Sequence, residues 1–257
     1  MMCGGKALGF LLASVWIGCV APVTWGAQFV GRTQRIEKVA EALRVGGPTW
    51  QQLSVQQELF LRDQLRTQAS SKVEVLFIDD STLTLGENSQ ITVDEQIVQP
   101  LAASTGVVNL VQGVMRAVVS DRYQKPGGRF EVHTPTAVAG VRGTSFISRC
   151  QLDTCLFLCL SRRVGVESLA FRGQPVFLEA GFFTEVKRGQ LPTRPRKMAD
   201  REMAVLVAMT TIAVNPGQEV LTGVVGTAIV GAIVYGTGEA FGVFDKDNND
   251  RVSSPSQ

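Results

Sequence analysis

Short runs of β-branched, aromatic and alternating residues, separated by turn-forming residues at regular intervals, constrain this chain most. Residues 73–78 (Val-Glu-Val-Leu-Phe-Ile) alternate in part, and residues 82–85 (Thr-Leu-Thr-Leu) and 90–93 (Gln-Ile-Thr-Val) alternate between apolar and polar side chains. Asp79-Asp80-Ser81 and the Gly-Glu-Asn-Ser of residues 86–89 separate them, and these residue types favour turns. Strands of this length and spacing predict an all-β fold, either a short-stranded sandwich or barrel or a β-solenoid.

The same pattern continues along the chain. No helix-period stretch separates the expected strands, which excludes a parallel α/β sheet. Ile36, Val39 and Leu43 have helical spacing, but a first strand over residues 42–45 is favoured. Further strands are expected at residues 107–111, 114–119, 129–133, 138–142, 146–149, 155–160, 164–169, 176–178 and 182–186.

The first 26 residues predict an export signal. Lys6 precedes an uncharged apolar run over residues 7–21, and Thr24 and Gly26 are small residues at the −3 and −1 positions of a cleavage site. The run is shorter than the roughly 20 residues of an ordinary membrane span. A lipoprotein cut between Gly18 and Cys19 is an alternative. We therefore expect an exported protein of the periplasm or cell envelope.

Three cysteines remain after such a cut. Cys150 and Cys155 flank a four-residue turn, and directly paired residues of a hairpin lie about 4.5–5.5 Å apart at Cβ, so a disulfide between them is one interpretation. The other interpretation is that these two and Cys159 are reduced, partly buried thiols. The cysteine spacing and the single histidine, His133, argue against a zinc site, and no cofactor is expected.

Four blocks of the sequence resemble the FecR domain. They are residues 59–67, residues 71–89, residues 110–116 and residues 130–146, where the last follows the family's Phe-x-Val-x-Thr-Pro … Val-Arg-Gly-Thr-x-Phe pattern. The resemblance implies an extracytoplasmic sensing or binding domain. Best-known members place a cytoplasmic anti-sigma segment before a membrane span, and an export signal at residue 1 leaves no room for one here. The expectation is therefore the sensing half without the sigma-binding half.

Arg62, Gln68 and Asp80 stand where the family usually has glycine. Asp tolerates positive φ, so Asp80 is expected to keep its turn, whereas Arg62 and Gln68 are expected to mark rebuilt turns. Gly143 lies between strands, where a bend or bulge is expected, so we expect this position to need a residue without a Cβ.

The chain offers no catalytic constellation. A Ser/His/Asp triad would need His133, which the family block makes a structural residue, and the adjacent Asp79 and Asp80 belong to a turn rather than an acid/base pair. We expect no enzyme. Lys and Arg number 25 against 23 acidic residues, so no nucleic-acid partner is predicted. The structural or binding candidates are Arg142, Gly143, Thr144, Asp79 and Asp80, of which Arg142 could receive a partner carboxylate.

The C-terminal part is apolar and rich in glycine. The stretch from Val220 to Gly238 has no charged residue and is long enough to span a bilayer. On a helix, Gly223, Thr227 and Gly231 would place small residues on one face. A membrane anchor, a helical hairpin and a soluble oligomerising region all remain open. The tail resembles a calcium loop only faintly and is expected to be polar and disordered.

These observations predict five segments and two functions. The segments are a signal peptide (1–26), a FecR-like β domain (27–190), a Pro/Arg linker (191–202), an apolar Gly-rich region (203–244) and a polar tail (245–257). The favoured function is binding or sensing of a protein partner or envelope ligand through a strand edge or face. The alternative is a structural, self-assembling envelope protein that uses its Gly-rich region to form homo-oligomers.

Overall fold

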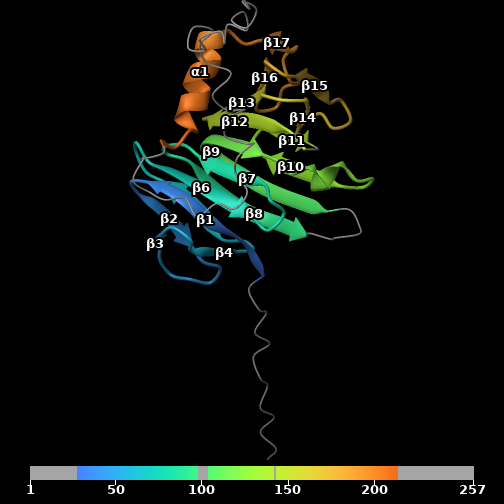
Figure 1. Cartoon of the computed structure of the whole chain (residues 1–257). Helices are drawn as coiled ribbons and strands as arrows, with labels where there is room; N and C mark the ends of the chain where they lie inside the picture. The colour runs from blue at the N-terminus through green and yellow to red at the C-terminus, as the bar shows by residue number, and fades with distance from the viewer. Residues whose placement is uncertain (1–27, 98–103, 142, 214–257) are drawn as a thin grey trace, which may run out of the picture.

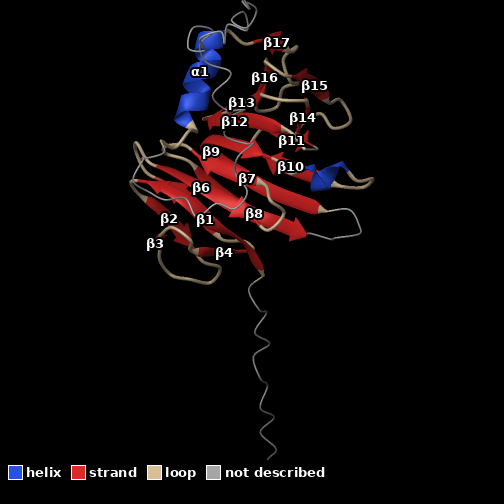
Figure 2. Cartoon of the chain, in the orientation of Figure 1, coloured by secondary structure: helices blue, strands red, loops and turns tan. Residues whose placement is uncertain are grey.

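The computed structural model describes residues 28–97, 104–141 and 143–213. Strands dominate them, and the helices are one α-helix and one short 3₁₀ helix (Figures 1 and 2). The first strands are β1 (Phe29–Glu37), β2 (Ala40–Leu43), β3 (Gln51–Gln52), β4 (Glu58–Phe60), β5 (Gln64–Thr67), β6 (Lys72–Phe77), β7 (Thr82–Leu85), β8 (Gln90–Ile97) and β9 (Thr105–Val118). After these come η1 (Asp121–Gln124), β10 (Arg129–His133), β11 (Ala137–Val141), β12 (Ser145–Gln151), β13 (Thr154–Cys159), β14 (Arg163–Ser168), β15 (Val176–Glu179), β16 (Phe182–Lys187), β17 (Arg196–Lys197) and α1 (Asp200–Met209).

Two sheets form a sandwich. Sheet A has the order β4-β1-β6-β7-β9-β12-β13-β16-β17. Sheet B has the order β3-β2-β5-β8-β9-β10-β11-β14-β15. All of these pairings are antiparallel except β9 with β10. The all-β prediction is confirmed, and of its alternatives the structure has the sandwich.

Strand β9 belongs to both sheets. Residues up to Gln112 pair within sheet B, and residues from Gly113 onward pair within sheet A. The sequence predicts two strands here, at residues 107–111 and 114–119, and that prediction is wrong. Gly113 has φ +91°, a conformation that glycine adopts readily, so the strand bends and continues instead of ending.

The main core fills the space between the sheets. Alternate residues of each strand point inward, so Leu65, Val75, Ile91, Phe130 and Phe157 are all fully buried. Apolar burial of this kind is the principal stabilising term of a sandwich.

A second apolar layer lies on the outer face of sheet A. Met203 and Leu206 of α1 are buried against Ile147 and Leu158 of the central strands. Figure 1 shows α1, in orange, beside β12 and β13. The beginning of the apolar run expected at residue 203 therefore packs on the β domain. The expected span from Val220 to Gly238 lies outside the described residues.

The segment expected as a linker is attached to the sandwich. Arg196 pairs with Phe183 in the β16–β17 ladder, and its guanidinium lies 5.0 Å from the Phe183 ring centroid. Five strands, β1, β3, β4, β5 and β17, were not among those predicted. The first strand expected over residues 42–45 corresponds in part to β2.

Candidate functional site

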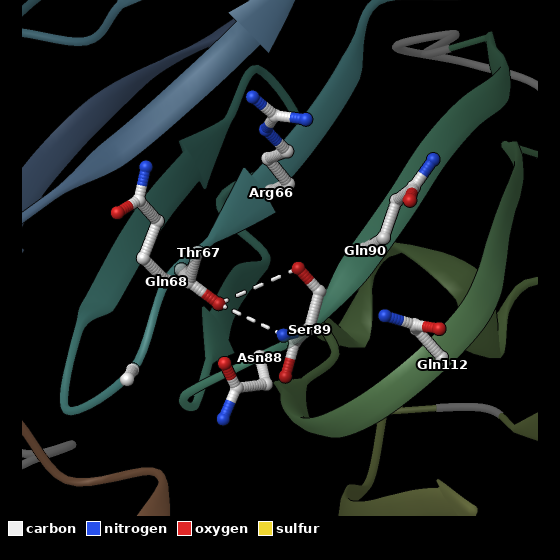
Figure 3. A pocket seen from close by; sticks show the side chains of 8 residues that line it. Arg66, Thr67, Gln68, Asn88, Ser89, Gln90 and Gln112 are labelled. Carbon is white, nitrogen blue, oxygen red and sulfur yellow. Dashed lines mark hydrogen bonds between the residues drawn. The ribbon is translucent and has the colours of Figure 1, made fainter.

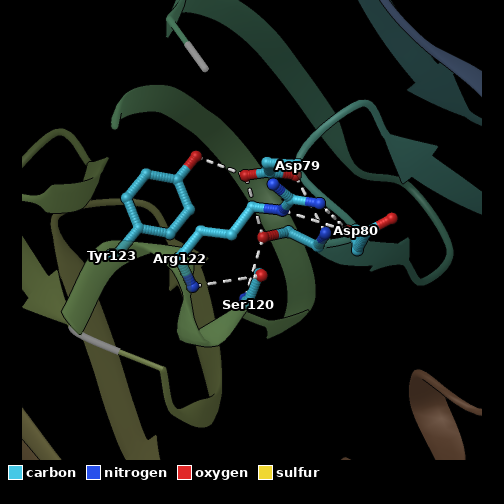
Figure 4. A network of polar contacts seen from close by, with 6 residues as sticks. Asp79, Asp80, Ser120, Arg122 and Tyr123 are labelled. Atoms are coloured by element: carbon cyan, nitrogen blue, oxygen red, sulfur yellow. Dashed lines mark hydrogen bonds and ion pairs between the residues drawn. The ribbon is translucent and has the colours of Figure 1, made fainter. Parts of the chain in front are cut away.

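The turn between β6 and β7 is built around a buried carboxylate. Asp79 is fully buried, and its Oδ1 accepts from the Ser81 backbone N–H at 2.8 Å. Its Oδ2 accepts from the Ser81 hydroxyl at 2.9 Å and also from the Tyr123 hydroxyl (Figure 4). These bonds compensate for removing the carboxylate from water. Asp79 therefore ties its own turn to a segment more than 40 positions away.

Asp80 lies on the solvent side of the same turn. Its φ of 68° confirms that it keeps the left-handed conformation expected of it. The Arg122 Nη2 and Nε donate to its Oδ2 at 2.8 and 3.1 Å (Figure 4). Ser120 adds a further link, because its backbone N–H donates to the Ser81 hydroxyl at 3.0 Å. The two adjacent aspartates thus bind two successive residues of η1, Asp80 binding Arg122 and Asp79 binding Tyr123.

Gly143 lies on the other side of η1. It has φ +60°, and a Cβ at this position would lie 2.5 Å from Asp121 Oδ1 and 2.6 Å from Gln124 Nε2. The positive φ therefore favours glycine here, whereas the atoms that a Cβ would meet are ends of flexible side chains that can move aside. Thr144, the next residue, is buried, and its hydroxyl donates to the Arg163 carbonyl at 3.2 Å.

Three sequence candidates thus converge on η1, namely Asp79, Asp80 and Gly143, and Thr144 follows Gly143 in the chain. Arg142, the fifth candidate, lies outside the described residues. Sequence reasoning did not identify η1 itself. It is a single 3₁₀ turn capped by Ser120, whose hydroxyl accepts from the Arg122 N–H at 3.3 Å, and one turn leaves no periodic signal. Tyr123, a fully buried residue of this turn, packs edge-on against Phe130 at 5.4 Å between ring centroids.

A hollow of about 520 Å³ opens beside this cluster on the outer face of sheet B. We call it the glycine trough. Adjacent positions on three strands, Gly140, Gly165 and Phe177, cross it because the ladders pair Gly140 with Gly165 and Gly165 with Phe177. Nothing lies within 4 Å of a Cβ built on Gly140, so its part of the floor is open. The lining residues are Arg129, Phe130, Glu131, Gly140, Val141, Thr144, Arg162, Arg163, Gly165 and Phe177.

Cationic and aromatic groups form the rim of the trough. The Arg163 guanidinium lies 4.1 Å from the Phe177 ring centroid, and the Phe177 side chain is 49% exposed. Arg162 donates to Asp121 at 2.8 Å, which links the trough to η1. Each of the three arginines that line the trough has an acidic partner: Arg129 lies 3.9 Å from Glu131, Arg162 2.8 Å from Asp121 and Arg163 3.5 Å from Glu179. Such a surface suits a ligand with a carboxylate and an apolar group side by side.

The cysteines lie away from this cluster. Cys150 and Cys155 are register partners in the β12–β13 hairpin, and a disulfide joins them with the Cα atoms 4.1 Å apart. Cys159 is a buried free thiol, and desolvation by burial raises its pKa to about 11. His133 hydrogen-bonds through Nε2 to Glu131 Oε2 at 2.8 Å.

The described residues offer neither a metal-ligand cluster nor a membrane-spanning helix. In residues 28–97, 104–141 and 143–213, no three His, Cys, Asp or Glu side chains are grouped as metal ligands. No helix in this part of the chain has the length and apolar character that a membrane crossing requires.

Comparisons with known proteins find two similar crystal structures and one matching family. Two crystal structures of a candidate anti-sigma factor from Parabacteroides distasonis ATCC 8503 are similar, with 15% and 13% sequence identity and TM-scores of 0.45 and 0.44. The similarity covers 56% and 55% of this chain but only 64% and 62% of those chains. No curated protein matches the chain. Residues 63–164 match the family described as FecR protein, and this range includes every one of the sequence candidates named above.

Proposed function

We propose that this chain is an exported binding and sensing module of the cell envelope, which engages a protein partner at the glycine trough. The observation that carries the proposal is the convergence of the FecR-block residues on η1, directly beside the trough. Thr144, which directly follows Gly143, is buried and lines the trough, while Arg162 connects the trough to η1 through Asp121. A partner bound there would contact the part of the domain that the family pattern specifies.

The proposed partner segment is an extended peptide with an acidic residue. β15 ends sheet B and pairs with β14 through Val176, Phe177, Leu178 and Glu179. The peptide would lie across the outer face of this end of the sheet, over Phe177, Gly165 and Gly140, because Gly140 is two strands in from the β15 edge. The peptide's carboxylate would pair with Arg163 or Arg162, and its apolar neighbour would lie over Gly140.

Export is the second part of the proposal, and it rests on the sequence pattern of residues 1–26. N-terminal sequencing of the protein purified from its own cells tests it. We expect a mature chain that starts at Ala27. A start at Met1 in the soluble cell extract would contradict export, and a lipid-modified start at Cys19 would support the lipoprotein alternative.

The partner is tested by photo-crosslinking in intact cells. Benzoylphenylalanine replaces Phe177 in the full chain, a conservative change because the residue is aromatic and half exposed. Leu152, which is 97% exposed at the β12–β13 turn, carries the same group as the control. We expect a protein adduct from position 177 that is absent from position 152.

A blocking variant makes this test specific. Gly140→Leu fills the trough, and it should leave the fold intact because nothing lies near a Cβ at Gly140 and its φ is not positive. We expect the adduct to disappear in this variant. An adduct that persists in this variant, or that forms equally from position 152, would contradict the proposal. An adduct with a second copy of this chain would support the self-assembling alternative.

A further inference from the structure

A second hollow, of about 300 Å³, opens near the other end of the outer face of sheet B. We call it the amide hollow, and its long polar side chains are Arg66, Gln68, Asn88, Gln90 and Gln112 (Figure 3). Four of these five carry a primary amide. It shares no lining residue with the glycine trough.

The strand register explains why these side chains gather. Arg66 of β5 pairs with Gln90 of β8, and Gln90 pairs with Gln112 of β9. Partners in adjacent strands point to the same face of a sheet. The neighbours Leu65 and Ile91 are fully buried in the core, so this row faces outward. Figure 3 shows Gln90 and Gln112 on adjacent strands, with Gln68 and Asn88 on the nearby turns.

Arg66 is held in place on two sides. Its Nε donates to Glu41 Oε2 at 2.7 Å, and its guanidinium lies 4.1 Å from the Trp50 ring centroid. The hydrogen bond from Arg66 is the main reason that the pKa of Glu41 is lowered, so the two groups remain an ion pair. The pair has no net charge, and the hollow therefore gives an anion little electrostatic attraction.

Most of the amide groups have unused hydrogen-bonding capacity. Among the residues that the structure describes, Gln90 donates to Gln64 alone, at 3.3 Å, and Gln68 to Glu41 alone, at 3.3 Å. Within residues 28–97, 104–141 and 143–213, the side chains of Asn88 and Gln112 have no protein partner. Each primary amide offers an acceptor oxygen and two donor hydrogens in one plane.

We infer that the amide hollow is a binding site for a neutral glycan. A sugar hydroxyl both donates and accepts, and adjacent hydroxyls on a pyranose ring present these groups a few ångströms apart, which suits the paired amides of Gln90 and Gln112. A neutral polyol needs no compensating charge, in agreement with the Arg66–Glu41 pair. This inference is independent of the proposed peptide site, because the two hollows lie on different strands.

Titration of the full chain with neutral oligosaccharides tests the inference. The probes are the tetrasaccharides of β-1,4-linked N-acetylglucosamine, β-1,4-linked glucose and α-1,4-linked glucose, with binding followed by isothermal calorimetry. The test variant is Gln90→Ala/Gln112→Ala, and the matched control is Gln151→Ala, an exposed glutamine on β12. None of these changes removes a core contact, so the variants should fold.

We expect saturable binding of at least one probe, unchanged in the control and weakened about tenfold or more in the double variant, since two hydrogen bonds are lost. The inference would be overturned if no probe binds at about 10 mM, a concentration above the Kd expected of a specific site. Binding that survives the double change would overturn it as well. Binding that inorganic phosphate displaces competitively would also overturn it, because the site would then be an anion site.

Discussion

Two adjacent carboxylates in the β6–β7 turn have different roles because one is buried and the other is not. Asp79 is fully buried and accepts three hydrogen bonds, one of them from Tyr123. Asp80 forms an exposed ion pair with Arg122: the Asp80 side chain is 71% exposed and the Arg122 side chain 46% exposed. Buried charged groups depend strongly on their partners, whereas exposed ion pairs contribute little to stability.

Substituting each aspartate by asparagine separates these roles. Asp79→Asn removes the charge and turns one of the two carboxylate oxygens into an NH₂ group, which cannot accept from the surrounding N–H and O–H donors. We therefore expect the free energy of unfolding to fall by about 3 kcal/mol. Asp80→Asn keeps a residue that tolerates positive φ and should cost less than about 1 kcal/mol. Urea denaturation of both variants measures the difference. Equal losses would contradict the assignment of Asp79 as the buried anchor.

Arg62 corrects an expectation about the family's glycine positions. The sequence suggests that a turn with arginine in place of glycine is rebuilt, but Arg62 has φ 67° and donates its N–H to the Val93 carbonyl at 2.7 Å. The neighbouring Asp63 is buried and accepts from the Phe60 N–H at 2.8 Å and from Arg44. These bonds fix the turn, so arginine adopts the left-handed conformation rather than changing it. Gln68 does not have a positive φ, whereas Ser70 nearby does.

Arg62→Gly should therefore stabilise the protein. The left-handed conformation costs a residue with a Cβ about 1–2 kcal/mol, and glycine removes this cost. Glycine also loses more conformational entropy on folding, which offsets about 0.5–1 kcal/mol of the gain. We expect a net gain of about 0.5–1 kcal/mol, read as a higher melting temperature. Gly140→Ala, at a strand position with ordinary φ and open space, is the control for chain entropy alone, and there the added Cβ should raise the melting temperature. A lower melting temperature for Arg62→Gly would mean that the arginine side chain makes a contact of its own.

Whether an element can be predicted depends on how local its signal is. β6, β7 and β10 carry period-two apolar patterns, and the sequence places each within about one residue of its observed start. β1 was missed because Arg32 and Arg35 interrupt its apolar residues, and it is identified as a strand by its pairing with the distant β4 and β6. The site shows the same limit. Asp79 and Gly143 could be named from the sequence, whereas Tyr123, which meets Asp79 across 44 positions, could not.

The β12–β13 hairpin gives a prediction at this scale. The Cys150–Cys155 disulfide closes a short loop, and the loop-entropy relation gives about 2 kcal/mol of stabilisation for a loop of this length. Cys150→Ala/Cys155→Ala should lower the free energy of unfolding by about that amount while circular dichroism keeps the strand signal. If the double variant and the parent have equal stability in the absence of reductant, the bridge is not formed in solution.

Cys159, at the end of the same hairpin, predicts a pH effect. Burial raises its pKa from an ordinary value of 9.0 to about 11, so the folded state keeps the thiol proton at a pH where the unfolded chain has lost it. Its contribution is complete below pH 9 and is lost as the pH rises through about 11. The stability difference between the parent and Cys159→Ala should thus shrink from about pH 8 to pH 11. A difference that stays constant would contradict the burial of this thiol.

At the scale of the whole molecule, β9 couples the two sheets. Its first part pairs with β8 and β10 in sheet B, and its second part pairs with β7 and β12 in sheet A. Ser89, from the Asn-Ser motif of the second family block, stabilises the crossing point. Its hydroxyl contacts the Val114 carbonyl at 3.0 Å and accepts from the Val114 N–H at 2.9 Å. Neither sheet can lose β9 without disturbing the other, so we expect the sandwich to unfold as one unit.

Gly113→Ala tests this coupling. A Cβ at Gly113 would overlap Ser89, including its backbone Cα, and φ is +91°, so strain and overpacking together should cost about 3 kcal/mol or more. If β9 couples the sheets, hydrogen exchange should accelerate together in β5 and β8 of sheet B and in β7 and β12 of sheet A. The matched control is Gly140→Ala, where a Cβ meets nothing within 4 Å and exchange should be no faster than in the parent. Faster exchange in only one sheet would mean that the two layers open independently, because the strain at the crossing would then be relieved without unfolding the other layer.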